Sequence, residues 1–394
     1  MSEPFPMQLF KITILPVLVL LYAGCTKKDL QTGATSENSC FSTSNTINGA
    51  VIDGQYIISY KSTSVTKTLS DEQLKQKTRA LILGGKVNAA SIKASFASGG
   101  GGFIAALTNK QVEEIKKDSS IKTVEPDRIV ALSICFTVVA PTLVTWNVNK
   151  VGYGDGRGKT AWIIDTGIDF DHPDLNVDQT RSKSFLPDVT SADDENGHGT
   201  HVAGIIGAKN NNIGVLGIAA DATLVSLRVL DKDGNGTLSW IIQALSYVSA
   251  NAKAGDVVNM SVGEDEVSDA LDQQVQSIAA KGIFVAIAAG NDSKPADQFS
   301  PGRANGDNIF TVSAVDSLDH FASFSNYGND AVDFAAPGVR IQSTYKDGLY
   351  AKMSGTSMAT PHLAGLLLLK GRNISYSGTA LNDPDGTPDK IVHK

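Results

Sequence analysis

Four side chains of reactive types stand where the sequence predicts turns: Asp165, His198, Asn291 and Ser357. Asp165 and Asn291 each come just after an apolar run. His198 stands between two glycines, which we expect to keep its ring accessible, and Ser357 precedes a long apolar run. A serine hydroxyl becomes a nucleophile when a base takes its proton and an acid orients that base. These residue types therefore predict acyl transfer, with an amide to stabilise the oxyanion.

The serine lies in the stretch 354–362, directly before the apolar run 363–369. A serine on a tight turn at a helix N-terminus exposes its hydroxyl, and the free N–H groups of the first helical turn can hold an oxyanion. Taken alone, the same pattern is also that of an ordinary helix cap. The nucleophile interpretation therefore depends on the other three side chains.

From Trp146 onward, strand-like apolar runs alternate with helix-like runs. We expect strands at 160–164, 222–230, 257–261, 283–288 and 309–314, and helices at 239–252 and 267–281. Near-continuous apolar strands separated by helices predict a parallel sheet that is covered on both faces. Active sites of such folds gather at the carboxyl ends of the strands, where Asp165 and Asn291 stand. We predict a doubly wound, mostly parallel α/β domain over residues 146–394.

The preceding part of the chain, residues 54–132, predicts a small α+β domain of the ferredoxin-like type. Strand-like runs at 56–60, 103–107 and 121–125 alternate with two helical stretches. Ser70 begins the first helix, and Thr108 with Gln111 has the chemistry of a capping box for the second.

The motifs DTGID (165–169), NGHGTHVAG (196–204), AAGND (288–292) and SGTSMATPH (354–362) resemble those of the subtilisin-like serine proteases, the subtilases of peptidase family S8. The order Asp, His, Ser is the order in subtilisin. The segments YIISYK, GGFIAALTNKQVEEI and VEPDRIV resemble the I9-type inhibitory propeptides of these enzymes. The resemblance implies an exported serine endopeptidase that is made as a proenzyme.

The resemblance also implies a role for each of the four side chains. Ser357 is the expected nucleophile, His198 the general base and later the general acid, and Asp165 the residue that orients His198. The Asn291 side chain and the Ser357 backbone N–H are expected to form the oxyanion hole. The chemistry then requires no cofactor.

Substrate is expected to bind along Ser261-Val262-Gly263 and at Gly290. Glu264 stands where relatives often have a second glycine, so we expect an acidic rim at the primary specificity pocket. The run 231–236 mimics half of an EF-hand loop, but Ile242 occupies the position of the required glutamate. We interpret this run as a glycine-rich turn beside the substrate cleft.

No metal site is assigned from the sequence. Asp169, Asp171 and Asp174 could offer oxygens to a structural calcium ion, as many relatives bind one, but the pattern does not define a site. His201 follows His198 by one helical turn without an HExxH pattern. We therefore expect His201 to be a packed helix residue.

Residues 1–25 have the layout of a secretory signal, with Lys11 before a short apolar core that ends at Ala-Gly-Cys25. Cys25 suggests lipidation and a membrane anchor, although Tyr22 departs from the usual lipobox leucine. An ordinary secretory signal, and so a secreted protein, remains the alternative. Residues 26–53 predict a solvated tether, and 133–145 a processing junction with self-cleavage in the range 131–142. Cys40 and Cys135 either form a disulfide or stay as thiols.

The composition is that of a globular protein, with 42% hydrophobic residues and a net charge of −7. The negative charge without a basic patch argues against nucleic acid as a partner. We expect protein or peptide substrates and the chain's own propeptide as partners. An esterase with the same triad and a catalytically silent binding protein on the same scaffold are the alternatives.

Overall fold

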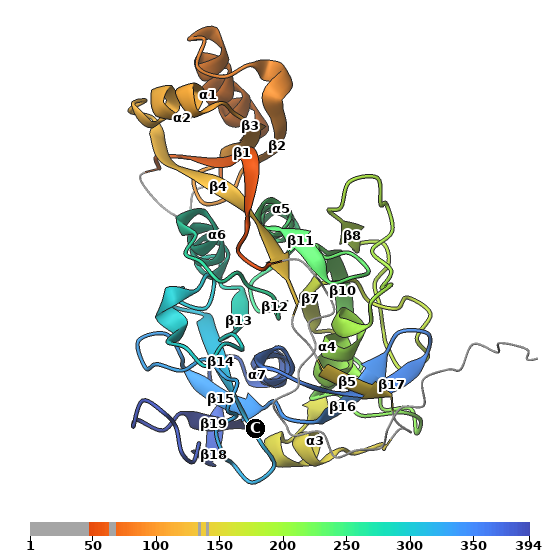
Figure 1. Cartoon of the computed structure of the whole chain (residues 1–394). Coiled ribbons are helices and arrows are strands. Elements are labelled where there is room, and N and C mark those ends of the chain that lie inside the picture. The colour runs from red at the N-terminus through yellow and green to blue at the C-terminus, as the bar shows by residue number, and fades with distance from the viewer. Residues whose placement is uncertain (1–46, 63–67, 133–134, 139–141) are drawn as a thin grey trace, which may run out of the picture. The chain divides into compact units, whose positions relative to one another are not determined.

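The computed structural model describes residues 47–62, 68–132, 135–138 and 142–394 of the chain, with the backbone alone at 135–138 (Figure 1). The predicted signal segment, Cys25 and Cys40 lie outside the described residues. Among the described residues, no helix has both the length and the apolar character that a membrane span requires.

The first described domain has the predicted βαββαβ order (Figure 1). Its elements are β1 (Val51–Tyr60), α1 (Asp71–Leu83), β2 (Ile92–Phe96), β3 (Gly102–Ala106), α2 (Asn109–Lys116) and β4 (Ile121–Ala131). Both helices begin with a capping box, at Ser70 and at Thr108. The antiparallel sheet has the order β11-β4-β1-β3-β2, in which β11 (Asn235–Thr237) comes from the second domain.

Strand β1 begins earlier than the predicted boundary between the tether and this domain at residue 54. Val51 pairs with Arg128 of β4, and the backbone oxygen of Ala50 accepts the N–H of Ile129 at 2.9 Å. Residues 51–53 are therefore part of the sheet, because β4 continues to Ala131 and offers them a partner.

The second domain contains the predicted, mostly parallel sheet. Nine strands follow the order β18-β19-β15-β14-β13-β12-β7-β10-β8. Their bounds are β7 (Thr160–Asp165), β8 (Lys183–Ser184), β10 (Thr223–Arg228), β12 (Val257–Met260), β13 (Phe284–Ala288), β14 (Ile309–Val315), β15 (Phe334–Pro337), β18 (Ser375–Thr379) and β19 (Lys390–His393). All pairs are parallel except β18 with β19, which are antiparallel.

Helices cover both faces of this sheet. They are α3 (Trp146–Val151), α4 (His198–Gly207), α5 (Leu238–Asn251), α6 (Asp269–Ala279) and α7 (Thr356–Lys370). Helix α4 packs against α7, and α5 packs against α6. The chain moves from β7 to β10 through α4 and back past β7 to β12 through α5, so right-handed crossovers put these helices on opposite faces. The order of the strands thus reverses at β7, where ligands bind in such sheets.

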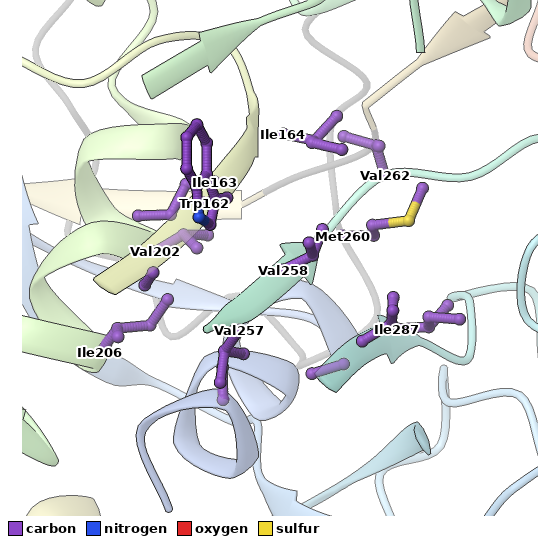
Figure 2. Close-up of a cluster of buried hydrophobic side chains, with 14 of the residues drawn as sticks. Trp162, Ile163, Ile164, Val202, Ile206, Val257, Val258, Met260, Val262 and Ile287 are labelled. Carbon is purple, nitrogen blue, oxygen red and sulfur yellow. The ribbon is translucent and has the colours of Figure 1, made fainter. Parts of the chain in front are cut away.

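The core beneath this reversal point is apolar and closely packed (Figure 2). Ile163 and Ile164 of β7, together with Val258 of β12, are almost fully buried, and Val202 of α4 packs against the same sheet. Complete burial of each such side chain contributes about 1.5–3 kcal/mol. This packing fixes the carboxyl ends of β7 and β12, from which the candidate site extends.

Two smaller sheets complete the second domain. Strands β6 (Gly154–Asp155) and β9 (Ala219–Ala220) pair in parallel. Strand β17 (Leu349–Ser354) pairs with β16 (Ile341–Tyr345) on one edge and with β5 (Cys135–Val138) on the other. Part of the predicted processing junction is therefore a strand, and Thr142, Leu143 and Val144 of the same junction are exposed.

Candidate active site

Asp165 and His198 meet at the carboxyl end of β7. Asp165 is the last residue of β7, and His198 is the first residue of α4. The Nδ1 atom of His198 lies 2.7 Å from Oδ1 of Asp165, and both side chains are fully buried. Asp165 Oδ1 also accepts the backbone N–H of Thr166 at 2.7 Å. The carboxylate is thus held in place and fixes the histidine with Nε2 directed away from it.

The two glycines beside His198 have a role different from the expected one. His198 has no exposed surface in this structure, so they do not keep its ring accessible. Gly197 has a φ of 111°, and a Cβ there would overlap the ring of Tyr345. A Cβ on Gly199 would overlap the backbone oxygen of Gly167. Both glycines are needed because the start of α4 lies against neighbouring residues.

Ser357 is the second residue of α7, and Gly355 is the N-cap of that helix. Its hydroxyl donates to the backbone oxygen of Ser261 at 3.1 Å, while Ser261 Oγ donates to the backbone oxygen of Ser357 at 2.9 Å. Among the described residues, His198 Nε2 is buried without a hydrogen-bond partner. That nitrogen is therefore an available acceptor in a site where the serine hydroxyl has a different partner.

The Asn291 amide is held with its nitrogen available. Its Oδ1 accepts the backbone N–H of Thr356 at 2.8 Å and the Thr356 hydroxyl at 3.0 Å. Asn326 supports the loop from below, because its side chain donates to Ala289 O and accepts from the backbone N–H of Asp292. With the oxygen occupied, Nδ2 is the group that can donate to a substrate oxyanion.

A cavity of about 140 Å³ adjoins Ser357. Its lining includes every substrate-binding residue proposed from the sequence: Ser261, Val262, Gly263, Glu264 and Gly290. Gly290 has a φ of 109°, and a Cβ there would overlap the Asn326 amide that supports the loop. The lining also includes Phe299 and Pro301, and the first domain contributes Leu132.

Glu264 lies in this lining, but it is covered rather than forming an open rim. Only 2% of its surface is exposed, and neither carboxylate oxygen has a hydrogen-bond partner among the described residues. Burial raises the pKa of Glu264 to about 8, against the attraction of Arg128, and Glu125 raises it further. Arg128 and Glu125 both belong to β4, so the first domain covers this acid.

The end of β4 pairs with β11 as an added strand (Figure 1), and Ala131 and Leu132 at this end line the cavity beside Ser357. Ala131 pairs with Asn235 of β11, and the backbone N–H of Leu132 donates to Gly234 O at 3.0 Å. The glycine-rich turn 231–236 therefore borders the cleft, as predicted. Beyond Leu132 the chain is next described at Cys135, which pairs with Ser354 of β17, close before Ser357.

Two carboxylates of β4 lie at the N-termini of the helices behind the cleft. Glu125 Oε1 accepts the backbone N–H of Ala270 at 2.8 Å, at the start of α6. Asp127 Oδ1 accepts the backbone N–H of Ser239 at 3.0 Å, at the start of α5. The free N–H groups and positive dipole end of a helix stabilise a carboxylate there. These contacts dock the first domain on the second.

The remaining histidines of α4 and α7 are structural. His201 Nε2 donates to the backbone oxygens of Ile341 and Ala351, and burial lowers the pKa of His201 to about 3. His362 donates from Nδ1 to Met358 O, and burial lowers the pKa of His362 to about 4. Both rings are therefore neutral and bonded, which agrees with the predicted packing role of His201.

The three acids that could offer oxygens to calcium have different environments, and Asp171 is exposed. Within the described ranges, no three His, Cys, Asp or Glu side chains form a metal cluster. Asp169 uses its two oxygens for the backbone N–H groups of Asp171 and Gly348. Asp174 is fully buried, with Oδ2 accepting Val215 N–H at 2.9 Å and Oδ1 without a partner.

With this geometry established, comparison with known proteins decides the family. The model of the subtilase family matches residues 156–382. The chain belongs to the subtilase family. The peptidase inhibitor I9 model matches residues 55–133. This chain is thus a serine endopeptidase of the subtilisin type that carries its own inhibitory propeptide domain.

Individual relatives agree with this assignment. The chain is 43% identical over 273 residues to subtilisin E of Bacillus subtilis. The aligned region covers 67% of this chain and 69% of that protein. The chain is 37% identical over 285 residues to a thermostable alkaline protease of Halalkalibacterium halodurans, covering 70% and 74%. A crystal structure of a cold-adapted subtilisin-like serine proteinase covers 64% of this chain and 98% of its own, with a TM-score of 0.58 and 34% identity.

Several residues of this subtilase site were not identified from the sequence. Thr166 bonds to Asp165, Asn48 bonds to Ala131 in the cavity lining, and Asp194 bonds to Thr166 and to the start of α4. Asp194 stands between two other acids, Asp193 and Glu195, so its sequence environment gives no reason to select it. Asn48 lies in the predicted tether, where a polar residue carries no signal.

Proposed function

We propose that Ser357, His198 and Asp165 are the nucleophile, the base and the orienting acid of this endopeptidase. The observation that carries the proposal is the 2.7 Å bond between Asp165 and His198 Nδ1, with Nε2 buried and unpartnered among the described residues. A buried carboxylate beside Nδ1 sets the tautomer in which Nε2 accepts a proton, and it stabilises the imidazolium that follows.

In the proposed reaction, the Ser357 hydroxyl leaves Ser261 O and transfers its proton to His198 Nε2 as Oγ attacks the peptide carbonyl. The carbonyl oxygen gains the negative charge, which Asn291 Nδ2 and the Ser357 backbone N–H stabilise. The imidazolium then protonates the leaving amine, and an acyl-enzyme remains on Ser357. Water attacks the acyl-enzyme with the same base, and the carboxylic acid product leaves.

The first domain is the inhibitor of this site until it is cleaved. We propose self-cleavage within 131–142 for the intact chain. The proposal is supported by Leu132 in the lining of the cavity beside Ser357 and by Cys135 paired with Ser354. The corresponding boundaries are a propeptide domain over 54–132, extended here to 51, a junction over 133–145 and a catalytic domain over 146–394.

The test uses the intact chain and two variants. A fluorophosphonate probe should label the wild type, while Ser357→Ala should be unlabelled and should remain at full length during refolding without other proteases. His198→Ala should fold but lose peptidase activity. Processing of the Ser357→Ala chain to the wild-type mature size, in the absence of other proteases, would overturn the assignment and the self-cleavage.

Export and a lipid anchor through Cys25 extend the proposal. They are supported by the secretory layout of residues 1–25 and by the Ala-Gly-Cys order, while Tyr22 argues for an ordinary signal. Metabolic labelling with a palmitate analogue distinguishes the two outcomes. Labelling lost in Cys25→Ala supports the anchor, and a label-free secreted protein supports the ordinary signal.

We also propose a structural calcium ion that takes no part in catalysis. The buried Asp174 fits one, because Oδ1 is an unpartnered oxygen among the described residues and the loop 209–215 lies against it, with Val215 N–H on Oδ2. Calcium would tie this loop to the segment before α4 and stabilise the fold. A melting temperature that rises with calcium in the wild type, but not in Asp174→Asn, would support the proposal.

A further inference from the structure

Helix α4 begins at His198 without a side-chain cap of its own. Its N-cap residue is Gly197, and the contact with Tyr345 requires a glycine there. The first N–H groups of a helix have no partner within it, so other side chains must satisfy them when they are buried. Any group that does so at α4 also sets the position of His198.

Asp194 supplies part of this cap, beside Asn196, whose Oδ1 accepts the backbone N–H of His198 at 3.1 Å. Its Oδ1 accepts the backbone N–H groups of Asn196 at 2.9 Å and Gly197 at 3.0 Å. Its Oδ2 accepts the backbone N–H of Thr200 at 3.0 Å and the Thr200 hydroxyl at 2.6 Å. The residue is 7% exposed, and among the described residues no cation pairs with it. The positive end of α4 therefore balances its charge.

The same carboxylate also reaches the strand that carries Asp165. Asp194 Oδ1 accepts the Thr166 hydroxyl at 2.9 Å, and the Thr166 oxygen in turn accepts the backbone N–H of Gly199 at 2.9 Å. Thr166 is directly bonded to Asp165 in the chain, and its N–H donates to Asp165 Oδ1. One side chain thus connects the end of β7 with the start of α4.

We propose that Asp194 is a positioning residue for catalysis: it fixes the Asp165–His198 pair by bonding to both elements that carry them. The proposal rests on the proposed roles of Asp165 and His198. Asp194 touches neither substrate nor the reacting atoms. Its effect is geometric, since a displacement of about 1 Å at a catalytic pair can lower the rate about 100-fold.

Asp194→Asn is the informative variant because it keeps the shape and one acceptor oxygen. The new NH₂ group faces N–H and O–H donors on one side of the network, so part of the cap is lost. We expect kcat to fall about 10- to 100-fold while KM stays within about twofold of the wild type. The matched control is Asp193→Asn, the same change at the exposed neighbour, which should keep the wild-type kcat.

Concentrations of active sites are measured by fluorophosphonate titration, so kcat refers to folded enzyme alone. A purely stabilising role would lower the melting temperature and the active fraction but leave kcat per active site unchanged. A second readout is the far-downfield proton of His198 Nδ1 in a Ser357→Ala background, identified by its loss in His198→Ala. Asp194→Asn should shift or broaden that resonance, and Asp193→Asn should not.

Thr166→Val gives an independent test, since it removes the link to β7 and leaves the Thr200 contacts of Asp194 in place. Like Asp194→Asn, this variant should have a lower kcat than the wild type. If Asp194→Asn and Asp193→Asn have equal kcat and equal Nδ1 resonances, the positioning role is wrong. If His198→Ala or Ser357→Ala remains active, the proposed catalytic roles fail instead, which distinguishes the two cases.

Discussion

Asn48 Oδ1 accepts the backbone N–H of Ala131 at 2.9 Å, so a residue before β1 bonds to the strand that fills the cleft. The Asn48 amide nitrogen donates to Asp265 at 2.8 Å and lies 3.5 Å from Gly263 O. One amide therefore stands between the inhibitory strand and the predicted substrate-binding stretch. The cleft is closed by two segments of the propeptide region rather than by β4 alone.

Asn48→Ala should weaken inhibition by the cleaved propeptide. Of its two side-chain partners, Ala131 belongs to the propeptide itself and only Asp265 to the catalytic domain. Loss of the bond to Asp265, worth about 0.5–1.5 kcal/mol, corresponds to an inhibition constant raised roughly 2- to 12-fold. The measurement is the recovery of peptidase activity on dilution of the processed mixture. Asn251→Ala, an exposed helix position whose amide bonds to Tyr247 O, is the control and should match the wild type.

Asn291→Ala should lower kcat about 100- to 1000-fold with a small change in KM, because the lost donor acts on the transition state; the magnitude is the one known for subtilisin itself. Steady-state kinetics on a peptide substrate checks this. Asn291→Asp keeps the shape and the bonds to Thr356 but not the donor, so it should be similarly slow. A kcat near the wild-type value in both variants would remove Asn291 from the oxyanion hole.

Binding of the propeptide should be stronger at acidic pH. In the docked state, burial raises the pKa of Glu125 to about 7 and that of Glu264 to about 8, from an ordinary value of 4.5. Between pH 4.5 and these raised pKa values, the docked propeptide and catalytic domain therefore bind more protons than the separated ones do. Affinity is thus fully present near pH 4.5 and is lost as pH rises toward 7 to 8.

The inhibition constant, measured against uninhibited activity at each pH, should rise at least ~10-fold between pH 5 and pH 8. Glu264→Gln removes one titrating group, and the change breaks no hydrogen bond because neither Glu264 oxygen has a partner among the described residues. The variant should show a smaller pH dependence. An unchanged slope would mean that Glu264 does not couple to propeptide binding.

Gly199→Ala should abolish or strongly reduce activity, while Gly378→Ala should be neutral. A Cβ at 199 would overlap Gly167 O and come close to Asp165, so α4 must move away from β7. At 378 no atom lies within contact distance. Circular dichroism and active-site titration separate misfolding from a folded but inactive site. Equal activities of the two variants would contradict the close approach of α4 and β7.

The sequence alone determined the fold class and the four reactive side chains, because each has a local signal. Asp165 and Asn291 follow apolar strands, His198 has two flanking glycines, and Ser357 precedes a helix. Strand β4 was predicted too short, since its second half gains its partners from Val51 and from β11, which are distant in sequence. Local patterns carry no information on such pairing.

Only the tertiary structure decided which polar residues support the site and what covers it. Asp194 and Asp193 are neighbours of the same type, yet one caps α4 while the other is exposed. Glu264 is an acid beside a glycine in the sequence, and in the fold it is buried in a cavity that is also lined by the end of β4 and by Ser300. Hydrogen bonding and desolvation depend on groups brought together by folding, so no spacing along the chain specifies them.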